Sequence, residues 1–354
     1  MSNSLSKHAA HFHKQAEWCE RLGSPFNAAL LRGLAAQLGD GSVLDSLLSG
    51  DAPLEPNAAD AGPLRAAGAL HALVLSGKDE ALARQYPAQR PDWDMIETLP
   101  AVYAALESHR DWVAAFLKNT PQTNETRRSI ALLPGFAALE GSLHLLEIGA
   151  SAGLNQHWDA FGYHGGHWTR DGAPGAPVIS SAWEGAAPAL PAMFQIESRK
   201  ACDQSPLDIE DPDARLALQA YIWPDQTDRL ERVRAAMELA RRRGVSVDKA
   251  DAADWLETQL AGLLPVGTTV IYHSIAWQYF DRETHERAST AIERAGAGAN
   301  ETQRLAWLRF EPERVFVPDG SSNVHPVDLV TWPGGHRRVI AHADPHGRKI
   351  TIAS

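Results

Sequence analysis

The sequence predicts an α/β protein in which a helical N-terminal domain precedes a mostly parallel β-sheet. Three observations lead to this expectation. Residues 1–140 carry apolar residues at helical spacing and no strand-like alternation. From residue 141 onward, short apolar runs alternate with helical stretches, which is typical of a parallel sheet with crossover helices. The tail then changes to short strands joined by tight turns. We therefore expect two domains, 1–140 and 141–354.

The first domain is predicted from helical periodicity and from helix start signals. Phe12, Ala16 and Cys19 recur every three or four positions, which places them on one helix face. Ser24 and Pro25 form a helix start, with a capping hydroxyl followed by a proline in the first turn. Further helical stretches are 64–75, 95–117 and 124–139, with a loop over 51–63 and a kink or restart expected at Pro100.

The second domain is predicted to contain five strands before its tail. They are 143–148, 193–197, 245–247, 268–274 and 305–310. The intervening helical stretches are 155–161, 225–243, 251–264 and 283–295. The tail strands, expected to form an antiparallel hairpin at the sheet edge, are 327–331, 338–343 and 349–353. Residues 163–191 are rich in Gly, Pro and Trp and have no clear period, so we expect an irregular or β-hairpin insertion there.

Composition excludes several classes of protein. The chain of 354 residues is 44% apolar and 22% charged, which is typical of a globular protein. A formal net charge of -11 disfavours broad electrostatic binding to nucleic acid. The two cysteines form neither a disulfide framework nor a CxxC metal pattern. The histidines include no compact pair of the HExxH type, so no metal site is predicted. No signal peptide and no apolar run of roughly 18 residues is found, so we expect a soluble, cytoplasmic protein.

A glycine-containing turn follows the predicted strand 143–148. Glu147 ends the strand, Gly149, Ser151 and Gly153 form the turn, and Asn155 opens the next helix. Such a turn lets a ligand approach the backbone and directs the free N–H groups of a helix start toward it. Glu147 is expected to order the loop or to engage a positively charged group, such as the ammonium of a methionyl moiety. The pattern resembles the first motif of class I S-adenosylmethionine-dependent methyltransferases, with serine at the middle glycine. This resemblance implies a Rossmann-like sheet of the methyltransferase type with S-adenosylmethionine as cofactor.

The same letters also form the Gly-x-Ser-x-Gly elbow of α/β-hydrolases, with Ser151 as nucleophile. His342, His346 and Asp344 are available as base and acid. Against this hypothesis, the preceding segment is mostly helical, no HGGG-type oxyanion segment lies upstream, and a buried glutamate on the nucleophile strand has no part in hydrolase chemistry. A tight turn that binds no ligand is a third interpretation.

The ends of the other predicted strands carry further candidates, because ligands of doubly wound sheets bind at the carboxyl ends of the strands. Asp203 follows the second strand, where a ribose-binding carboxylate is usual. Asp251 follows the third, where an acid often lies near adenine. Helix N-capping is the alternative for both residues. The spacing of Asp203 from the glycine turn exceeds the usual ~20 residues, which the 163–191 insertion explains.

The fourth predicted strand ends in a polar His273–Ser274 pair, which is unusual after an apolar run. We expect these two residues in the site, with His273 as a general base. The alternative for His273 is a core histidine with its hydrogen bonds satisfied. Trp277 and Tyr279 are expected either to wall a substrate pocket or to pack in the core.

Several motifs in order along the chain resemble a bacterial family catalogued as domain of unknown function family 2332. They are Thr123-Asn-Glu-x-x-Arg128, Leu145–Asn155 around the glycine turn, Tyr221-x-Trp-Pro-Asp-Gln-x-x-Arg229, His273-Ser274 and His346-Gly347. The resemblance implies a Rossmann-like fold grouped with methyltransferases and leaves the reaction open. Asn124, Glu125 and Arg128 are expected to close over the cofactor and substrate, although Glu125 and Arg128 also have the spacing of a simple helical ion pair.

Taken together, these patterns predict methyl transfer from S-adenosylmethionine to a small acceptor, with the helical domain as a lid. Such an enzyme acts chiefly by aligning donor and acceptor. The alternatives are a non-catalytic nucleoside-binding or regulatory protein, favoured by the absence of a recognisable acceptor motif, and the Ser151 hydrolase.

Overall fold

The computed structural model describes residues 2–39, 41–50, 53–57, 59–122, 124–317, 319–320 and 324–353, with side chains from residue 7 onward. Thr123, which begins one of the motifs above, lies outside the described residues. The chain divides into two compact units. One comprises Met1–Thr123 and Glu210–Glu231, and the other comprises Asn124–Ile209 and Arg232–Ser354. We call them the helical unit and the sheet unit.

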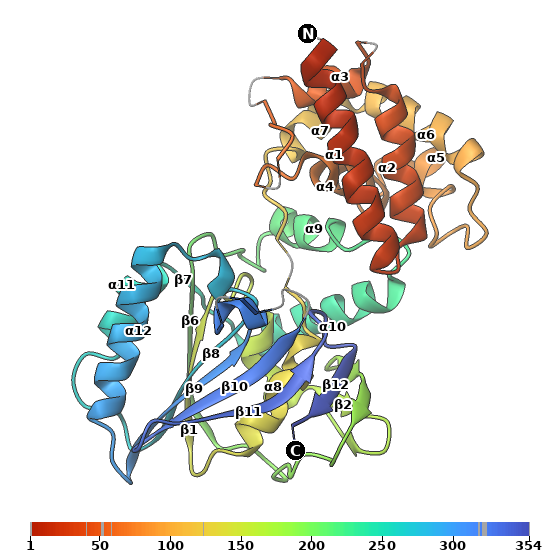
Figure 1. Cartoon of the computed structure of the whole chain (residues 1–354). Coiled ribbons are helices and arrows are strands. Elements are labelled where there is room, and N and C mark those ends of the chain that lie inside the picture. The colour runs from red at the N-terminus through yellow and green to blue at the C-terminus, as the bar shows by residue number, and fades with distance from the viewer. Residues whose placement is uncertain are drawn as a thin grey trace. The chain divides into compact units, whose positions relative to one another are not determined.

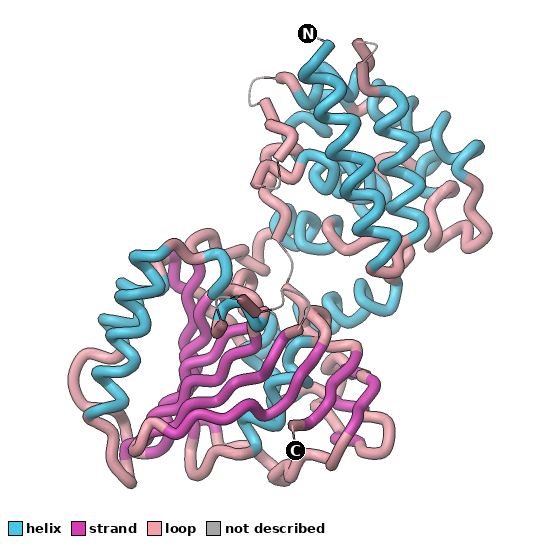
Figure 2. The backbone as a smooth tube through the Cα atoms, viewed as in Figure 1, coloured by secondary structure: helices cyan, strands magenta, loops and turns pink. Residues whose placement is uncertain are grey.

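The helical unit consists of helices packed around one apolar core (Figures 1 and 2). Its helices are α1 (Ser2–Arg21), α2 (Pro25–Gln37), α3 (Val43–Leu48), α4 (Gly62–Leu75), α5 (Glu80–Ala83), α6 (Met95–Ser108), α7 (Arg110–Phe116) and α9 (Pro212–Ala220). Phe12, Ala16 and Cys19 are fully buried, as their helical spacing predicts. The helix that contains Pro100 does not restart there. Instead, α6 continues through the proline, and the break from α7 falls at His109.

A remote segment of chain completes the start of α2. Ser24 makes no side-chain capping bond to its own helix. Its hydroxyl donates instead to Oδ1 of Asp225 (2.5 Å), and the amide of Phe26 donates to Oδ2 of the same carboxylate (3.0 Å). A helix start leaves its first N–H groups without partners in the helix, and a carboxylate there also complements the helix dipole. Asp225 therefore ties residues 210–231 to the helical unit, together with Ala217, Ala220 and Tyr221, which lie in its apolar core.

The sheet unit is built on a nine-stranded sheet in the order β5-β12-β11-β10-β9-β8-β1-β6-β7. The strands are β1 (Leu143–Ile148), β5 (Ala182–Glu184), β6 (Ile196–Asp203), β7 (Asp248–Lys249), β8 (Gly267–Ser274), β9 (Gln303–Phe310), β10 (His325–Trp332), β11 (His336–Ala343) and β12 (Lys349–Ile352). Strands β7, β6, β1, β8 and β9 are parallel, and β10 pairs antiparallel with both β9 and β11. From β7 to β10 the order is the 3-2-1-4-5-6 of a doubly wound sheet, with its reversal between β1 and β8. The predicted α/β class with antiparallel tail strands is therefore confirmed.

Helices cover both faces of this sheet (Figure 1). On one face, α11 (Ala252–Gln259) and α12 (Arg282–Ala297) share a core with Leu146, Ile271 and Trp307. On the other face, α8 (Arg128–Ala137) packs against β9, β10 and β11, and Phe136 contacts Tyr272 edge-on at 5.3 Å between ring centroids. Residues 124–140 thus belong with the sheet, which differs from the predicted boundary at residue 140.

The segment 163–191 supplies short strands and turns. Strands β2 (Gly162–His164), β3 (Thr169–Arg170) and β4 (Val178–Ser180) form a small separate sheet, whereas β5 pairs parallel with β12. The edge of the main sheet is therefore formed by β5 rather than by the tail hairpin. The expected helix 155–161 is the 3₁₀ segment η1 (Leu154–Ala160), and α10 (Thr227–Arg243) agrees closely with its prediction.

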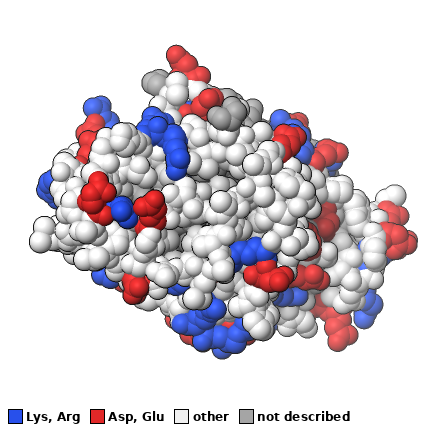
Figure 3. Space-filling view, turned by 90° about the horizontal axis from the view of Figure 1, so that it is seen from below, with Lys and Arg blue, Asp and Glu red and all other residues white. Residues whose placement is uncertain are grey.

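None of the described helices has the length and apolar character needed to cross a membrane. On the face drawn in Figure 3, acidic and basic side chains are interspersed, with broad uncharged areas between them.

Candidate functional site

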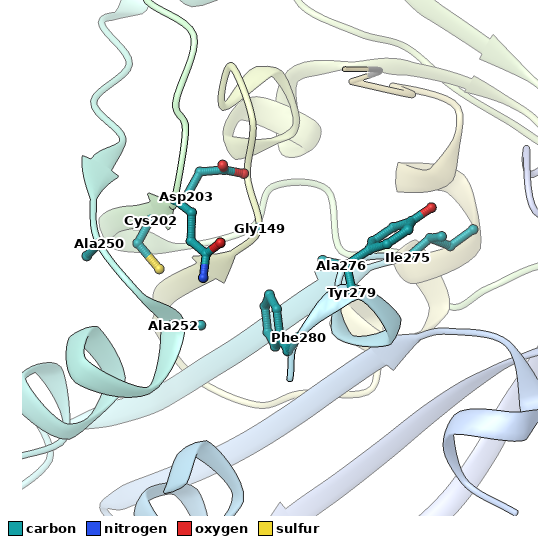
Figure 4. A pocket seen from close by; sticks show the side chains of 10 residues that line it. Gly149, Cys202, Asp203, Ala250, Ala252, Ile275, Ala276, Tyr279 and Phe280 are labelled. Carbon is teal, nitrogen blue, oxygen red and sulfur yellow. The ribbon is translucent and has the colours of Figure 1, made fainter. Parts of the chain in front are cut away.

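A pocket of about 190 Å³ lies at the carboxyl ends of four parallel strands (Figure 4). Each of β1, β6, β7 and β8 contributes the residues at or just beyond its end. The lining residues are Gly149, Cys202, Asp203, Gln204, Ala250, Ala252, Ile275, Ala276, Tyr279 and Phe280. The pocket therefore lies beside the reversal of strand order between β1 and β8, where ligands of doubly wound sheets bind. Its volume is below the ~300–1,000 Å³ of typical enclosed ligand sites.

The glycine turn after β1 has a backbone that other residue types rarely adopt. Gly149 and Gly153 have φ of +67° and +68°, and Ser151, which is not a glycine, has φ of +53°. A Cβ on Gly149 would lie 2.4 Å from Cβ of Ala276. The turn therefore contacts the loop after β8 directly, and only glycine fits there. Glycine adopts such a backbone freely, whereas at Ser151 it costs ~1–3 kcal/mol, and strained residues of this kind cluster at functional sites.

Asp203 holds the glycine turn from the neighbouring strand. Its Oδ2 accepts the Ser151 amide at 2.8 Å, and its Oδ1 accepts the Ser205 amide at 2.9 Å. The Ala150 amide also donates to the Cys202 carbonyl at 3.1 Å. A carboxylate has about four acceptor positions, so Asp203 keeps capacity for hydroxyl groups of a ligand. Its half-buried place in the pocket wall agrees with the position predicted for it.

Glu147 is not among the residues that line the pocket. Its side chain is buried, and its Oε2 accepts the Tyr272 hydroxyl at 3.1 Å on the face covered by α8. Burial raises the pKa of Glu147 to about 8 despite the hydrogen bond from Tyr272, so the group is largely protonated at neutral pH. A neutral carboxyl on that face does not suit the expected contact with a ligand ammonium. The other expected role was to order the loop, whereas the hydrogen bond of Glu147 joins β1 to Tyr272 of β8.

His273 is a satisfied core histidine. Its Nδ1 lies 2.7 Å from Oε1 of Glu311, and its Nε2 lies 3.1 Å from the Nε1–H of Trp307, a group that only donates. The ring is therefore neutral, with a proton on Nδ1. Burial lowers the pKa of His273, although its bond to Glu311 opposes this shift. With 1% of the residue exposed and both nitrogens bonded, His273 has no position from which to accept a substrate proton.

Glu311 was not anticipated from the sequence. Its Oε1 accepts three N–H groups, from Nδ1 of His273 and from the amides of Ala276 (2.9 Å) and Trp277 (3.0 Å). The residue is fully buried. These bonds fix the turn in which Ile275 has φ of +52°. The available signal was the one applied to Asp203, an acidic residue directly after a parallel strand.

The two aromatic candidates after β8 have different environments. Trp277 is buried and stacks between His273 and His285, with 5.1 Å between centroids in each case. It belongs to the core. Tyr279 is 77% exposed and lies at the rim of the pocket. In Figure 4, Phe280 lies between Ala252 and Ala276, whereas Tyr279 points away from Asp203.

Asn124 clamps the glycine turn from outside. Its Oδ1 accepts the Leu154 amide at 2.8 Å, and its Nδ2 donates to the Ala150 carbonyl at 3.3 Å. Asn155 donates from Nδ2 to the Glu125 carbonyl at 3.4 Å. The predicted motif residues therefore meet the turn through its backbone rather than through the pocket.

Glu125 and Arg128 connect other loops at the same end of the sheet. The Arg128 guanidinium donates to the carbonyls of Ser274 and Pro345, each at 3.1 Å. Oε2 of the buried Glu125 lies 3.6 Å from Nδ1 of His346. Ser274 takes part through this carbonyl. These contacts bring together segments that are distant in the sequence, which the motif pattern alone does not specify.

Asp251 acts as the N-cap of α11. It accepts the amides of Ala253 (2.8 Å) and Asp254 (3.4 Å), and also bonds Gln204 and Thr284. This is the capping alternative considered from the sequence, and Asp251 itself is not among the pocket-lining residues.

The candidate partners of Ser151 in a hydrolase have other contacts. His342 is exposed on β11, and Asp344 accepts the amides of His346 (3.0 Å) and Lys349 (2.7 Å) within its own turn. Among the described residues, no group of three or more His, Cys, Asp and Glu side chains is arranged to hold a metal ion.

Residues 9–351 match the model of a family described as uncharacterized protein conserved in bacteria (DUF2332). Because the match covers nearly the whole chain, the chain belongs to this family. Neither the curated proteins nor the solved structures gave a match.

Proposed function

We propose that this member of the bacterial family binds S-adenosylmethionine in the pocket at the ends of β1, β6, β7 and β8, and transfers its methyl group to a small acceptor. The observation that carries the proposal is the coincidence of three features at one place. The strand order reverses there, the glycine turn has a strained backbone, and the carboxylate of Asp203 holds that turn. A reversal point in a doubly wound sheet is the usual binding place of nucleoside cofactors.

The residues present suit such a ligand. The absence of a side chain at Gly149 allows close approach to the turn, and the remaining acceptor positions of Asp203 suit ribose hydroxyls. Phe280 and Tyr279 offer aromatic surface beside the pocket for the adenine ring. Because the pocket is small, the nucleoside would occupy it and the amino-acid end would extend along the glycine turn.

When bound, the cofactor supplies an activated methyl group. The protein's part is to hold the donor in one orientation and to exclude water, since alignment alone lowers the barrier of such a transfer substantially. His273 is not assigned as a base in this proposal because both of its nitrogens are bonded. The small acceptor and a cytoplasmic location belong to the same proposal. The location is supported by Cys19 and Cys202, which are buried free thiols.

Hydrolysis by Ser151 is the second candidate, because its φ of +53° on a strand-to-turn junction is also a feature of nucleophile elbows. One experiment separates the two. The purified chain is titrated calorimetrically with S-adenosylmethionine and S-adenosylhomocysteine, and a parallel sample is treated with a fluorophosphonate probe. Saturable one-site binding without labelling supports the methyltransferase proposal. Labelling of Ser151 without binding of either ligand supports the hydrolase. Binding of S-adenosylmethionine with no methyl transfer to any acceptor in a screen supports a non-catalytic nucleoside-binding protein.

A further inference from the structure

A second cavity lies within the helical unit, and none of the motif residues is among those that line it. It has a volume of about 770 Å³ and is bounded by α3, α4, α7 and four described residues that precede α4, Gly50, Pro53, Leu54 and Asp60. Its charged lining residues are Arg65, Arg110, Lys118, Asp60 and Asp111. The volume falls within the ~300–1,000 Å³ typical of small-molecule sites.

Arg65 is the unusual residue of this cavity because, among the residues that the structure describes, no carboxylate pairs with its buried charge. The residue is 8% exposed. Its Nε donates to the Asp60 carbonyl at 2.6 Å, and its Nη1 donates to the carbonyls of Leu117 (2.9 Å) and Asn119 (3.0 Å). In the described part of the chain, the hydrogen bonds of Arg65 come from Nε and Nη1 and go to backbone carbonyls, and none of its contacts is with a carboxylate or made by Nη2. Burying a charge is costly unless it is paired, so this guanidinium is a strong attractor for an anion.

Two further cations line the same cavity. Arg110 is held in place by a hydrogen bond from its Nη2 to Oγ of Ser46 at 2.9 Å. Lys118 follows the end of α7. Of the two acids, Asp60 is engaged by its own loop, since its Oδ2 accepts the Glu55 amide (2.7 Å) and Nδ2 of Asn57 (3.3 Å).

We propose that this cavity binds a small organic molecule through an oxyanion, either a carboxylate or a phosphate, which pairs with Nη2 of Arg65. The three backbone carbonyls hold the guanidinium in one orientation before the ligand arrives, so little side-chain entropy is lost on binding. Arg110 and Lys118 would complete the positive end of the cavity. This site lies wholly in the helical unit and does not depend on the function proposed for the sheet unit.

The competing explanation is that Arg65 serves only to satisfy the carbonyls of Leu117 and Asn119, just after α7. The test uses the full-length protein, with isothermal titration against sodium phosphate and sodium malonate at constant ionic strength. We expect saturable binding of one of the two at millimolar or lower Kd, and the one that binds identifies the oxyanion. Loss of one charge-assisted hydrogen bond corresponds to roughly tenfold weaker binding or more.

Three variants decide the matter. Arg65→Lys should weaken anion binding at least about tenfold. The double variant Arg110→Gln/Lys118→Gln should also weaken anion binding, and it leaves the buried Arg65 in place. The matched control is Lys78→Gln/Arg84→Gln, which removes two cations of the helical unit that do not line the cavity. It should bind like the unmodified chain. If Arg65→Lys does not fold, the double variant decides. No saturable binding of either anion, or equal weakening in the control, overturns the proposal.

Discussion

Gly149 is the residue at which the proposed site tolerates change least. An alanine there would place its Cβ 2.4 Å from that of Ala276, in a backbone with φ of +67°. We expect Gly149→Ala to bind the cofactor at least about tenfold more weakly. We also expect its free energy of unfolding to fall by about 2–4 kcal/mol, because the new side chain adds backbone strain and overpacking.

The matched control for that variant is Gly166→Ala. Gly166 has a similar φ of +72°, but a Cβ added there would have no other atom within 4 Å. The free energy of unfolding of Gly166→Ala should fall by only about 1–2 kcal/mol, and this variant should bind S-adenosylhomocysteine as the unmodified chain does. Calorimetric titration and urea unfolding of both variants measure the difference. Equal binding by the two would remove the glycine turn from the site.

The raised pKa of Glu147 should make the free energy of unfolding depend on pH. Its folded-state pKa of about 8 lies above the ordinary value of 4.5, so between these values the folded chain holds a proton that the unfolded chain releases. This contribution is fully present below pH 4.5 and is lost as the pH rises through 8. Between these two pKa values the free energy of unfolding falls by about 1.4 kcal/mol per pH unit for one such group.

Glu147→Gln imitates the protonated side chain and keeps an acceptor for the Tyr272 hydroxyl. We expect its stability relative to the unmodified chain to increase between about pH 5 and pH 8, as measured by urea unfolding at both values. Parallel stability curves for the two proteins would mean that Glu147 is ionised in the fold.

At the scale of elements, the loop after β8 depends on Glu311. Glu311→Ala would leave the amides of Ala276 and Trp277 and Nδ1 of His273 without an acceptor, and each such buried donor costs about 1–3 kcal/mol. We expect faster hydrogen exchange at the Ala276 and Trp277 amides, with β8 itself still protected. Glu311→Gln, which keeps a carbonyl oxygen, should be milder.

The control for this loop is Glu301→Ala, an exposed residue just before β9. It should leave exchange in the loop unchanged. Exchange at Ala276 and Trp277 that is equally slow in Glu311→Ala would show that the turn is held by packing alone.

The elements were predictable to the extent that their own residues determine them. The apolar run 143–148 became β1, and the run at 268–274 became β8 with one residue added. The run 245–247 did not become a strand. Val245 and Val247 lie beside Gly153, and the two-residue β7 follows them. The predicted helix after the glycine turn is a 3₁₀ segment with non-helical backbone at His157. Such outcomes depend on tertiary neighbours, which local periodicity does not contain.

The candidate site was predictable only in part, for the same reason. The rule that ligands bind at carboxyl ends of strands located Gly149 and Asp203 in the pocket wall. It also selected His273, whose nitrogens are occupied by Glu311 and Trp307. These partners come from β9 and the residue after it, and their proximity to β8 follows from sheet order rather than from any local pattern.

At the scale of the whole molecule, the division of the chain could not be derived from periodicity. The predicted crossover helix 225–243 begins at Asp225, yet Asp225 caps α2 of the helical unit, to which residues 210–231 belong. We expect Asp225→Ala to destabilise the helical unit by about 1–2 kcal/mol or more, because it removes the acceptor of both the Phe26 amide and the Ser24 hydroxyl.

Urea unfolding monitored by helical circular dichroism measures this effect. Asp92→Ala, which removes an exposed carboxylate from the same unit, is the control and should be nearly neutral. If the two variants unfold alike, Asp225 contributes nothing to the helical unit.

The proposed function depends on a nucleoside cofactor that binds at the reversal of strand order in the sheet unit. Hydrogen exchange of the full-length chain, followed by mass spectrometry with and without saturating S-adenosylhomocysteine, tests both binding and place. We expect slower exchange in peptides that contain the turn 149–155, the Asp203–Ser205 segment and the loop 275–280, with unchanged exchange in α3 and α4 of the helical unit. Unchanged exchange throughout, or protection confined to other segments, would contradict it.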